Sequence, residues 1–405
     1  MRRKWTRPAG LSAACLILTS TICSAGGQYG PGVSDTEIKI GNTMPYSGPA
    51  SSYGTIGQSD AAYFAMINER GGISGRKINF ISRDDGYSPP KTVEQARRLV
   101  EQDQVLLLFN TFGTPPNSAI QRYLNDAKVP HLFIATGAKG GTIPHTFPGP
   151  LAGRPAIGSR HASGLATSSR ASPTPKSRCS IRTMISGWTT LPVCATVSAT
   201  RPTDDRRHSE LRDQRRDDRL ADRYATSSGA NVLLTAAIPK FAAQAIRKIY
   251  AIGWKPTHLL TRASNSVGTV MRPAGAEKTV GIISETFLKD PTDPQWQDTL
   301  EYKEWLAWMK KYNTLGNVAD AFTVYGYTAA QTMVAVLQAC GDTLTRESVM
   351  KQAANIHALK LPMLLPGITI STSADDFAPI KQMQLEKFDG TTWKLFGDVI
   401  SGSGS

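Results

Sequence analysis

Cysteine is scarce in this sequence, with 5 residues in a chain of 405. Cys15 and Cys23 lie within the first 25 residues, Cys179 and Cys194 lie between residues 151 and 228, and Cys340 is the one cysteine elsewhere. This excludes a disulfide-stapled miniprotein, and no intramolecular disulfide is expected. The length instead predicts two or three domains, at roughly 100–200 residues each.

The sequence also lacks the short motifs of common catalytic and metal sites. It contains no HExxH, GxSxG, P-loop or CxxC pattern, and its six histidines show no metal-ligand spacing. We therefore predict no catalytic residue, no metal site and no cofactor.

No apolar run is long enough to span a bilayer. The longest one near the N-terminus runs from Leu11 to Ile22, whereas a spanning helix needs about 20 apolar residues. Four basic residues precede this run and the small residues Ser24-Ala25-Gly26 follow it. This arrangement is typical of a secretory signal peptide, so we predict that residues 1–25 are a signal cleaved near Ala25 and that the product is exported.

The net charge is high but unevenly distributed. Lys and Arg number 46 against 32 Asp and Glu, which gives a formal net charge of +14 and would favour nucleic acid or an acidic membrane surface as a partner. Four positive charges lie in the predicted signal peptide and a net of seven lies between residues 151 and 228, so the remaining chain carries +3. We therefore predict no nucleic-acid partner.

Outside residues 151–228, short apolar strands alternate with amphipathic helices. Such alternation predicts an α/β fold with doubly wound parallel sheets, and two separate series predict two lobes that face a cleft. Ligands of open α/β sheets bind outside the carboxyl ends of the strands. The expected strands are 37–41, 77–82, 105–109, 131–135, 231–235 and 258–261, and the expected helices are 57–70, 91–102, 116–127 and 241–252.

Seven segments stand out along the chain: GVSDTEIKIG at 32–41, PYSGP at 45–49, NERGGISGRK at 68–77, RDDGY at 83–87, PKFAAQAIRK at 239–248, LKDPTDP at 288–294 and VYGY at 324–327. In their order and spacing, these segments resemble the branched-chain amino acid substrate-binding proteins of ABC importers, the leucine/isoleucine/valine type of the periplasmic binding protein type I family. The resemblance covers about 29–149 and 229–403.

The resemblance implies a fold of two Rossmann-like lobes joined by a hinge. Lobe 1 would comprise 29–149 plus about 288–366, and lobe 2 about 150–287 plus 367–403. It also implies a periplasmic, non-enzymatic protein that captures a small-molecule ligand by lobe closure. The ligand, an amino acid or related organic solute, would be delivered to an ABC permease complex in the inner membrane.

Two loops after strands of lobe 1 match the loops that hold the ligand's carboxylate in this family. A carboxylate needs hydroxyls and backbone N–H groups, preferably at a helix N-terminus, and both loops supply them, although ordinary βα turns also use Gly and Thr. The loop at 261–267 contains no acidic residue for a ligand's ammonium, so an amide, an aromatic acid or another organic acid remains open. The predicted ligand-binding residues are Tyr53, Gly113, Thr114, Ala135, Thr136, Gly137 and Ser264.

Residues 150–228 do not match the family. Codons can be assigned to 176–203 so that a two-base shift spells KIAVLYQNDDFGMDYLAGLRDGLGDKAD, and a one-base shift of 208–223 can spell IRNYEISDATTVSQIV. Both strings resemble the missing segment of lobe 2, so we interpret the tract as frameshifted. The alternative is a genuine Arg/Ser/Thr-rich loop. An out-of-frame tract predicts that part of lobe 2 is disordered and that this chain binds its ligand poorly.

Three other functions remain open from the sequence. The chain could be an amide- or amino-acid-responsive sensor of the same fold, which the predicted signal peptide argues against. It could be an inactive, pseudogene-like product. Nucleic-acid binding through the Arg-rich tract would show a steep salt dependence.

Overall fold

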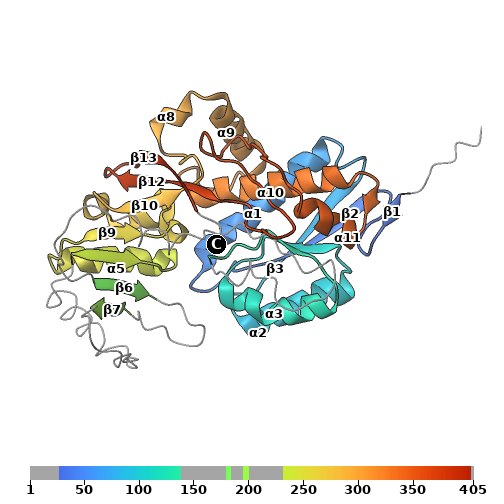
Figure 1. Ribbon diagram of the computed structural model, residues 1–405, viewed down its shortest axis with the longest axis horizontal. Helices are drawn as coiled ribbons and strands as arrows, with labels where there is room; N and C mark the ends of the chain where they lie inside the picture. Colours follow the sequence, from blue (N-terminus) through green and yellow to red (C-terminus); the bar gives the residue numbers. More distant parts are fainter. Residues whose placement is uncertain (1–26, 138–178, 184–194, 200–230, 403–405) are drawn as a thin grey trace, which may run out of the picture.

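The computed structural model describes residues 27–137, 179–183, 195–199 and 231–402. Of these, 179–183 and 195–199 are described by their backbone alone. The predicted signal peptide and most of the tract at 150–228 lie outside the described residues. Two lobes are visible in Figure 1, one on each side of the molecule. The predicted two-lobed α/β fold is therefore confirmed.

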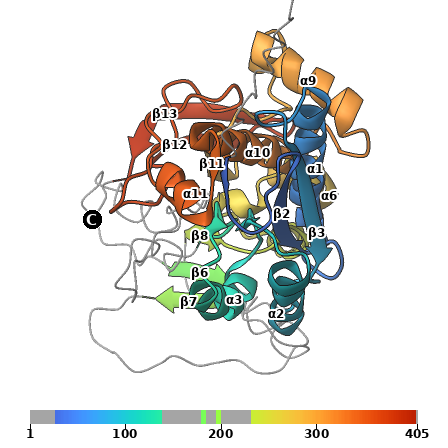
Figure 2. The same ribbon diagram turned by 90° about the vertical axis from the view of Figure 1, so that its right-hand side faces the viewer.

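Lobe 1 is built on a four-stranded parallel sheet in the order β3-β2-β4-β5. Every expected strand and helix before residue 137 is present in this lobe. The helices α2 and α3 cover one face of the sheet, and α1, α10 and α11 lie on the other (Figure 2). The elements are β2 (Glu37–Met44), α1 (Gly54–Glu69), β3 (Lys77–Asp84), α2 (Pro89–Arg97), β4 (Leu107–Phe109), α3 (Thr114–Asp126) and β5 (His131–Leu132).

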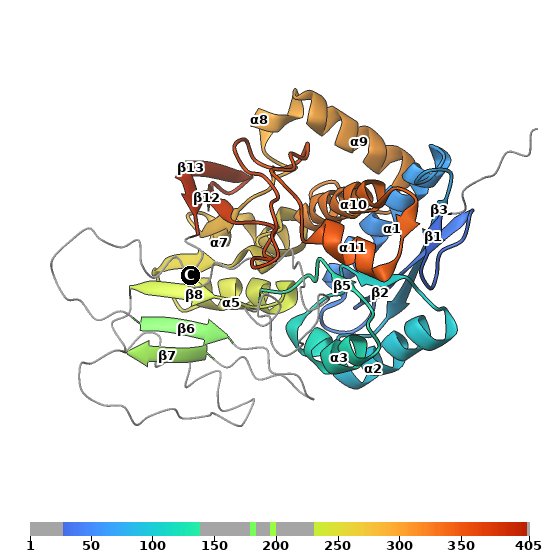
Figure 3. The same cartoon turned by 45° about the vertical axis from the view of Figure 1, so that its right-hand side comes forward.

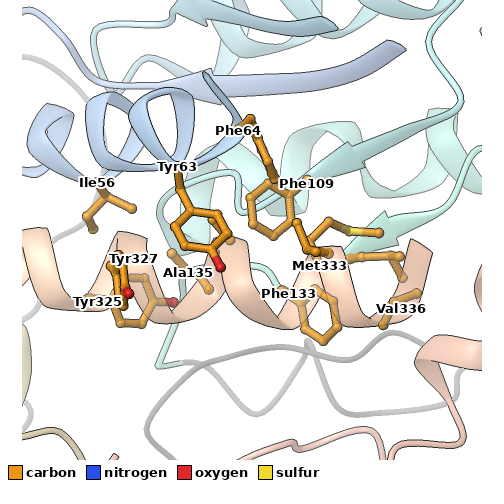
Figure 4. Close-up of a cluster of buried hydrophobic side chains, with 14 of the residues drawn as sticks. Ile56, Tyr63, Phe64, Phe109, Phe133, Ala135, Tyr325, Tyr327, Met333 and Val336 are labelled. Carbon is orange, nitrogen blue, oxygen red and sulfur yellow. The ribbon is translucent and has the colours of Figure 1, made fainter. Parts of the chain in front are cut away.

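The core of lobe 1 lies between the sheet and two packed helices, α1 and α10 (Ala321–Cys340). Figure 4 shows Phe109 and Phe133 from the sheet side meeting aromatic and aliphatic side chains of these helices. The helices approach closely because Gly326 has no side chain: a Cβ there would lie 2.6 Å from the Cβ of Ser59 on α1. This contact brings the start of α10 against the start of α1.

Lobe 2 contains a five-stranded mixed sheet in the order β13-β12-β10-β9-β8. The strands β8, β9 and β10 are parallel, and β12 and β13 form an antiparallel hairpin added at one edge. A short antiparallel pair, β6 (Cys179–Thr183) and β7 (Ala195–Ala199), lies next to β8 (Figure 3). The other elements are β8 (Val232–Thr235), α5 (Pro239–Ala251), β9 (Thr257–Leu260), α6 (Arg272–Ala274), α7 (Ala276–Thr279), β10 (Ile283–Thr286), β12 (Gln382–Phe388) and β13 (Trp393–Ser401).

The chain passes from lobe 2 to lobe 1 after β10 and returns before β12. The two crossing segments pair with each other, since Lys289 donates to the Met363 carbonyl at 2.9 Å and Leu365 donates to the Phe287 carbonyl at 3.0 Å. Between the crossings, a set of helices packs on lobe 1 and at its upper edge in Figure 1. That set is α8 (Pro294–Gln297), α9 (Leu300–Tyr312), α10 and α11 (Arg346–Ala353), with β11 (Thr343–Leu344) pairing with β1 (Gln28–Tyr29).

Candidate functional site: a cleft between the two lobes

A cavity of about 300 Å³ lies between the two lobes, at the carboxyl ends of their parallel strands. Its volume is at the lower end of the range for small-molecule sites. Lobe 1 and α10 supply Tyr53, Ile56, Tyr87, Phe112, Gly113, Thr114, Ala135, Thr136, Gly137, Phe322 and Tyr325. Lobe 2 supplies Ala236, Ala237, Ile238, Thr261, Arg262, Ala263 and Glu285.

The polar edge on lobe 1 is formed by the loops that follow β4 and β5. The N–H of Gly113 donates to the Ala135 carbonyl at 3.0 Å, which ties the two loops together. The hydroxyls of Thr114 and Thr136 then lie 2.6 Å apart. Asn117 holds the start of α3 by donating its side-chain amide to the Gly113 carbonyl at 2.6 Å. A pair of hydroxyls therefore stands beside the N-terminus of a 13-residue helix, where a polar or anionic group is favoured.

One wall of the cavity is aromatic. The ring of Tyr53 stacks on Phe112 with centroids 4.0 Å apart, and the ring of Phe322 is tilted against Tyr53 with centroids 4.9 Å apart. Tyr87 extends the wall, at 5.9 Å from Phe112. The Tyr53 hydroxyl donates to the carbonyl of Ala263 in lobe 2 at 2.8 Å. The wall is thus held across the cleft by a direct bond between the lobes.

Among the described residues that line the cavity, the charged ones, Arg262 and Glu285, lie on lobe 2. Arg262 follows β9, and its guanidinium lies 4.1 Å from the ring centroid of Phe287 and 5.5 Å from that of Tyr325. Glu285 on β10 is only 4% exposed, and its Oε1 accepts the backbone N–H of Arg262 at 3.2 Å. Burial raises the pKa of the Glu285 carboxyl to about 7, although the Arg262 N–H and guanidinium oppose that shift.

Six of the seven residues predicted from the sequence line this cavity. Ser264 does not: its side chain is fully buried, and its hydroxyl donates to the carbonyl of Ala237. It therefore positions a lining residue of lobe 2 from behind. Direct contact of the other six with a ligand stays a prediction.

Sequence reasoning missed Arg262, Glu285 and the α10 residues Phe322 and Tyr325. The loop at 261–267 indeed holds no acid, but the adjacent strand β10 brings Glu285 to the cavity instead. Their position in the sequence could have indicated Arg262 and Glu285, because both lie at the carboxyl end of a parallel strand, where ligands of such sheets bind.

Asp60 is a buried carboxyl near this site that makes stability depend on pH. It is fully buried on α1, one oxygen accepts the Asn110 side-chain amide at 2.8 Å, and the other has no hydrogen-bond partner. Burial raises the pKa of Asp60 well above its usual range, against a smaller lowering by Asn110. As the pH rises through the ordinary Asp range, the unfolded chain ionises while the folded chain stays protonated, so stability falls.

Asp60→Asn should therefore flatten the loss of stability between pH 4 and pH 8. Urea denaturation across this range measures the free energy of unfolding. As the pH rises, the free energy of unfolding of the variant should increase relative to that of the wild type, by about 1.4 kcal/mol for each unit that separates the folded and unfolded pKa of Asp60. Asp298→Asn, at a fully exposed position, is the matched control. Parallel pH profiles for wild type and Asp60→Asn would contradict this account.

Among the described residues there is no group of three or more His, Cys, Asp and Glu that could hold a metal ion. The same part of the chain has no helix long and apolar enough to cross a membrane.

Comparison with known proteins agrees with the two-lobed fold. A family model described as "Periplasmic binding protein" matches residues 37–153 and 222–392. An amino acid binding protein of Pseudomonas aeruginosa is 37% identical over 79 residues, which is 19% of this chain and 21% of that protein. A Leu/Ile/Val-binding protein homolog of Brucella abortus is 29% identical over 115 residues, 27% of this chain and 28% of that protein. The chain thus matches only 21–28% of the length of these curated relatives.

Solved structures are similar over most of the chain. A branched chain amino acid ABC transporter protein from Thermus thermophilus with bound valine has a TM-score of 0.72 at 14% identity, covering 92% of this chain and 98% of that one. A fatty acid ABC transporter substrate-binding protein from Thermomonospora curvata has a TM-score of 0.67 at 20% identity, covering 93% and 95%. At these identities the likeness shows the fold. Because the family model spans well over half of the sequence, the chain belongs to the periplasmic binding protein family, whose members bind their solutes and are not enzymes.

Proposed function

We propose that this protein is an extracytoplasmic solute-binding protein that captures a small organic solute and delivers it to an ABC permease. The solute would be a branched-chain amino acid or a related amide or organic acid. The observation that carries the proposal is the cavity between the lobes, which takes its lining from the strand ends of both. A solute bound there contacts both lobes at once and stabilises their closed arrangement.

The relatives support the same proposal from two directions. The curated relatives are named for amino acid binding, and one similar structure holds valine while another is named for fatty acids. The fold therefore accommodates solutes with and without an ammonium group. In our proposal the hydroxyls of Thr114 and Thr136 receive the polar group of the solute, and the aromatic wall receives its body.

Thermal unfolding of the full chain with and without solutes tests the proposal. The panel is L-leucine, L-valine, L-phenylalanine, benzamide and benzoate. At a solute concentration 100 times Kd, binding adds about 2.7 kcal/mol to stability, which raises Tm by several degrees. We expect at least one member of the panel to produce this shift, and an out-of-frame tract at 150–228 would raise the Kd and with it the solute concentration at which the shift is seen.

Replacing both cleft hydroxyls, as Thr114→Val with Thr136→Val, should weaken the binding of that solute by tenfold or more, because its polar group loses two hydrogen bonds. Thr391→Val changes an exposed threonine in the β12–β13 turn and is the control. An unchanged Tm with every solute of the panel would overturn the proposal.

A further inference from the structure

The charged residues in the described lining of the cavity belong to one lobe. Among the described residues, those of lobe 1 and α10 that line the cavity are uncharged, and they include two glycines, two threonines and five aromatic residues. The ionisable acid and base both come from lobe 2, as Glu285 and Arg262. What these two groups do within the cleft therefore determines which charge a solute must carry.

The guanidinium of Arg262 is held in place by rings. It lies over Phe287 and near Tyr325, an arrangement in which aromatic faces stabilise a cation. Within the part of the chain that the structure describes, it forms no ion pair, and its Nε has no hydrogen-bond partner. Arg262 is therefore oriented by packing, and its charge-assisted hydrogen bonds are not used up by the protein around it.

The carboxyls around Arg262 bond to other groups. Glu285 accepts the backbone N–H of Arg262 and not its guanidinium. Glu386 accepts the side-chain amide of Asn265 at 2.6 Å, and Asp290 accepts the hydroxyl and N–H of Thr292 at 2.5 and 2.8 Å. Burial raises the pKa of Glu285 to about 7 and that of Asp290 to about 6, and it raises the pKa of Glu386 as well. Of these three carboxyls only Glu285 lines the cavity, and near neutral pH a carboxyl with a pKa of about 7 is about half ionised, so among the described lining residues it only partly offsets the charge of Arg262.

The described lining of the cleft thus has an excess of positive charge, to which the N-terminus of α3 adds. A zwitterion would leave this excess in place and would bring an ammonium into the same small cavity as the guanidinium. A monoanion would neutralise it. The body of that anion would face Tyr53, Phe112, Phe322 and Tyr87, whose rings favour a flat aromatic solute by stacking.

We infer that the preferred solute is an aryl carboxylate without an ammonium group, neutralised by Arg262 and packed against the wall of Tyr53, Phe112 and Phe322. This inference rests on the proposed function and narrows its solute class. It makes Arg262 a specificity-determining residue for negatively charged solutes. From the sequence, the loop at 261–267 was considered for an acidic residue, and no role was assigned to Arg262.

Isothermal titration of the full chain with benzoate, benzamide and L-phenylalanine tests the inference. Benzoate and benzamide share a ring and nearly the same shape but differ in charge, while L-phenylalanine adds the ammonium. We expect benzoate to bind at least tenfold more tightly than either. Arg262→Gln should reduce the preference for benzoate over benzamide to less than threefold, and Arg262→Lys, which keeps the charge, should retain part of it.

Arg272→Gln is the control, because Arg272 is exposed on α6 of the same lobe and does not line the cavity. It should leave the preference unchanged. Tighter binding of L-phenylalanine than of benzoate would overturn this inference and leave the proposed function standing. Equal affinity of the wild type for benzoate and benzamide would also overturn it, without any variant. Failure of every solute in the panel would overturn both.

Discussion

The Gly113→Ala variant is expected to lose at least tenfold in affinity for the panel solute that the wild type binds most tightly. Gly113 precedes α3 with φ of +93°, a conformation that residues with a Cβ rarely adopt. A Cβ at this position would also collide with the edge of the Tyr87 ring, which lines the cavity. Relief of this collision moves either the aromatic wall or the loop that carries Thr114.

The expected loss of affinity follows from the backbone strain and from the collision with Tyr87. Backbone strain at such a residue costs about 1–3 kcal/mol, and a tenfold loss of affinity corresponds to about 1.4 kcal/mol. Isothermal titration measures the loss of affinity, and thermal unfolding of the solute-free variant measures how much the strain lowers the stability of the fold.

Gly71→Ala is the matched control for strain alone. Gly71 has φ of +102°, lies at the end of α1, and would bring its Cβ near no other atom. This variant should lose some stability and keep its affinity. If Gly71→Ala weakened binding as much as Gly113→Ala, the effect would come from general destabilisation and the assigned role of Gly113 would be wrong.

The arrangement of lobe 1 was predictable because its strands are buried and its helices are amphipathic. The strand expected at 105–109 is β4, and the helix expected at 116–127 is α3, which begins two residues earlier. The strand expected at 131–135 ends as a regular strand at Leu132. Phe133 adopts φ of +53°, a local backbone choice that apolar periodicity does not encode. Periodicity therefore located the elements but not where each one ends.

The lobe-2 hairpin of β12 and β13 was not identified as strands in the sequence. Its turn contains Asp389 and Gly390, a common hairpin signal, and Gly390 has φ of +106°. The signal was present, but β13 is largely exposed and shows little apolar alternation. The hairpin became visible only through its pairing with β10.

The candidate site also has one part that the sequence predicted and one part that it did not. The lobe-1 loops could be found because each directly follows a buried strand and resembles a family motif. Arg262, Glu285 and Tyr325 come from three elements far apart in the sequence, and only the sheet order of lobe 2 and the packing of α10 bring them together. Their chemistry depends on burial and on ring contacts, which a single sequence does not specify.

The Trp308→Ala variant should lose about 3–5 kcal/mol of stability, the usual range when a large buried ring is truncated. Trp308 on α9 is 3% exposed, and its ring lies 4.7 Å from Tyr327 on α10 and 6.4 Å from Tyr63 on α1. Truncation would open a cavity where three helices meet. Urea denaturation followed by far-UV circular dichroism measures the loss without relying on the fluorescence of the deleted ring.

Two further variants distinguish the effect of losing the packing around Trp308 from the effect of removing a tryptophan elsewhere. Trp308→Phe keeps an aromatic ring between Tyr63 and Tyr327 and should retain more than half of the stability that alanine loses. Trp296→Ala removes a partly buried ring on α8 and should cost less than Trp308→Ala. Because α10 also carries Phe322 and Tyr325 into the cleft, Trp308→Ala should weaken solute binding as well. A loss below about 1 kcal/mol would mean that α9 is not anchored through this ring.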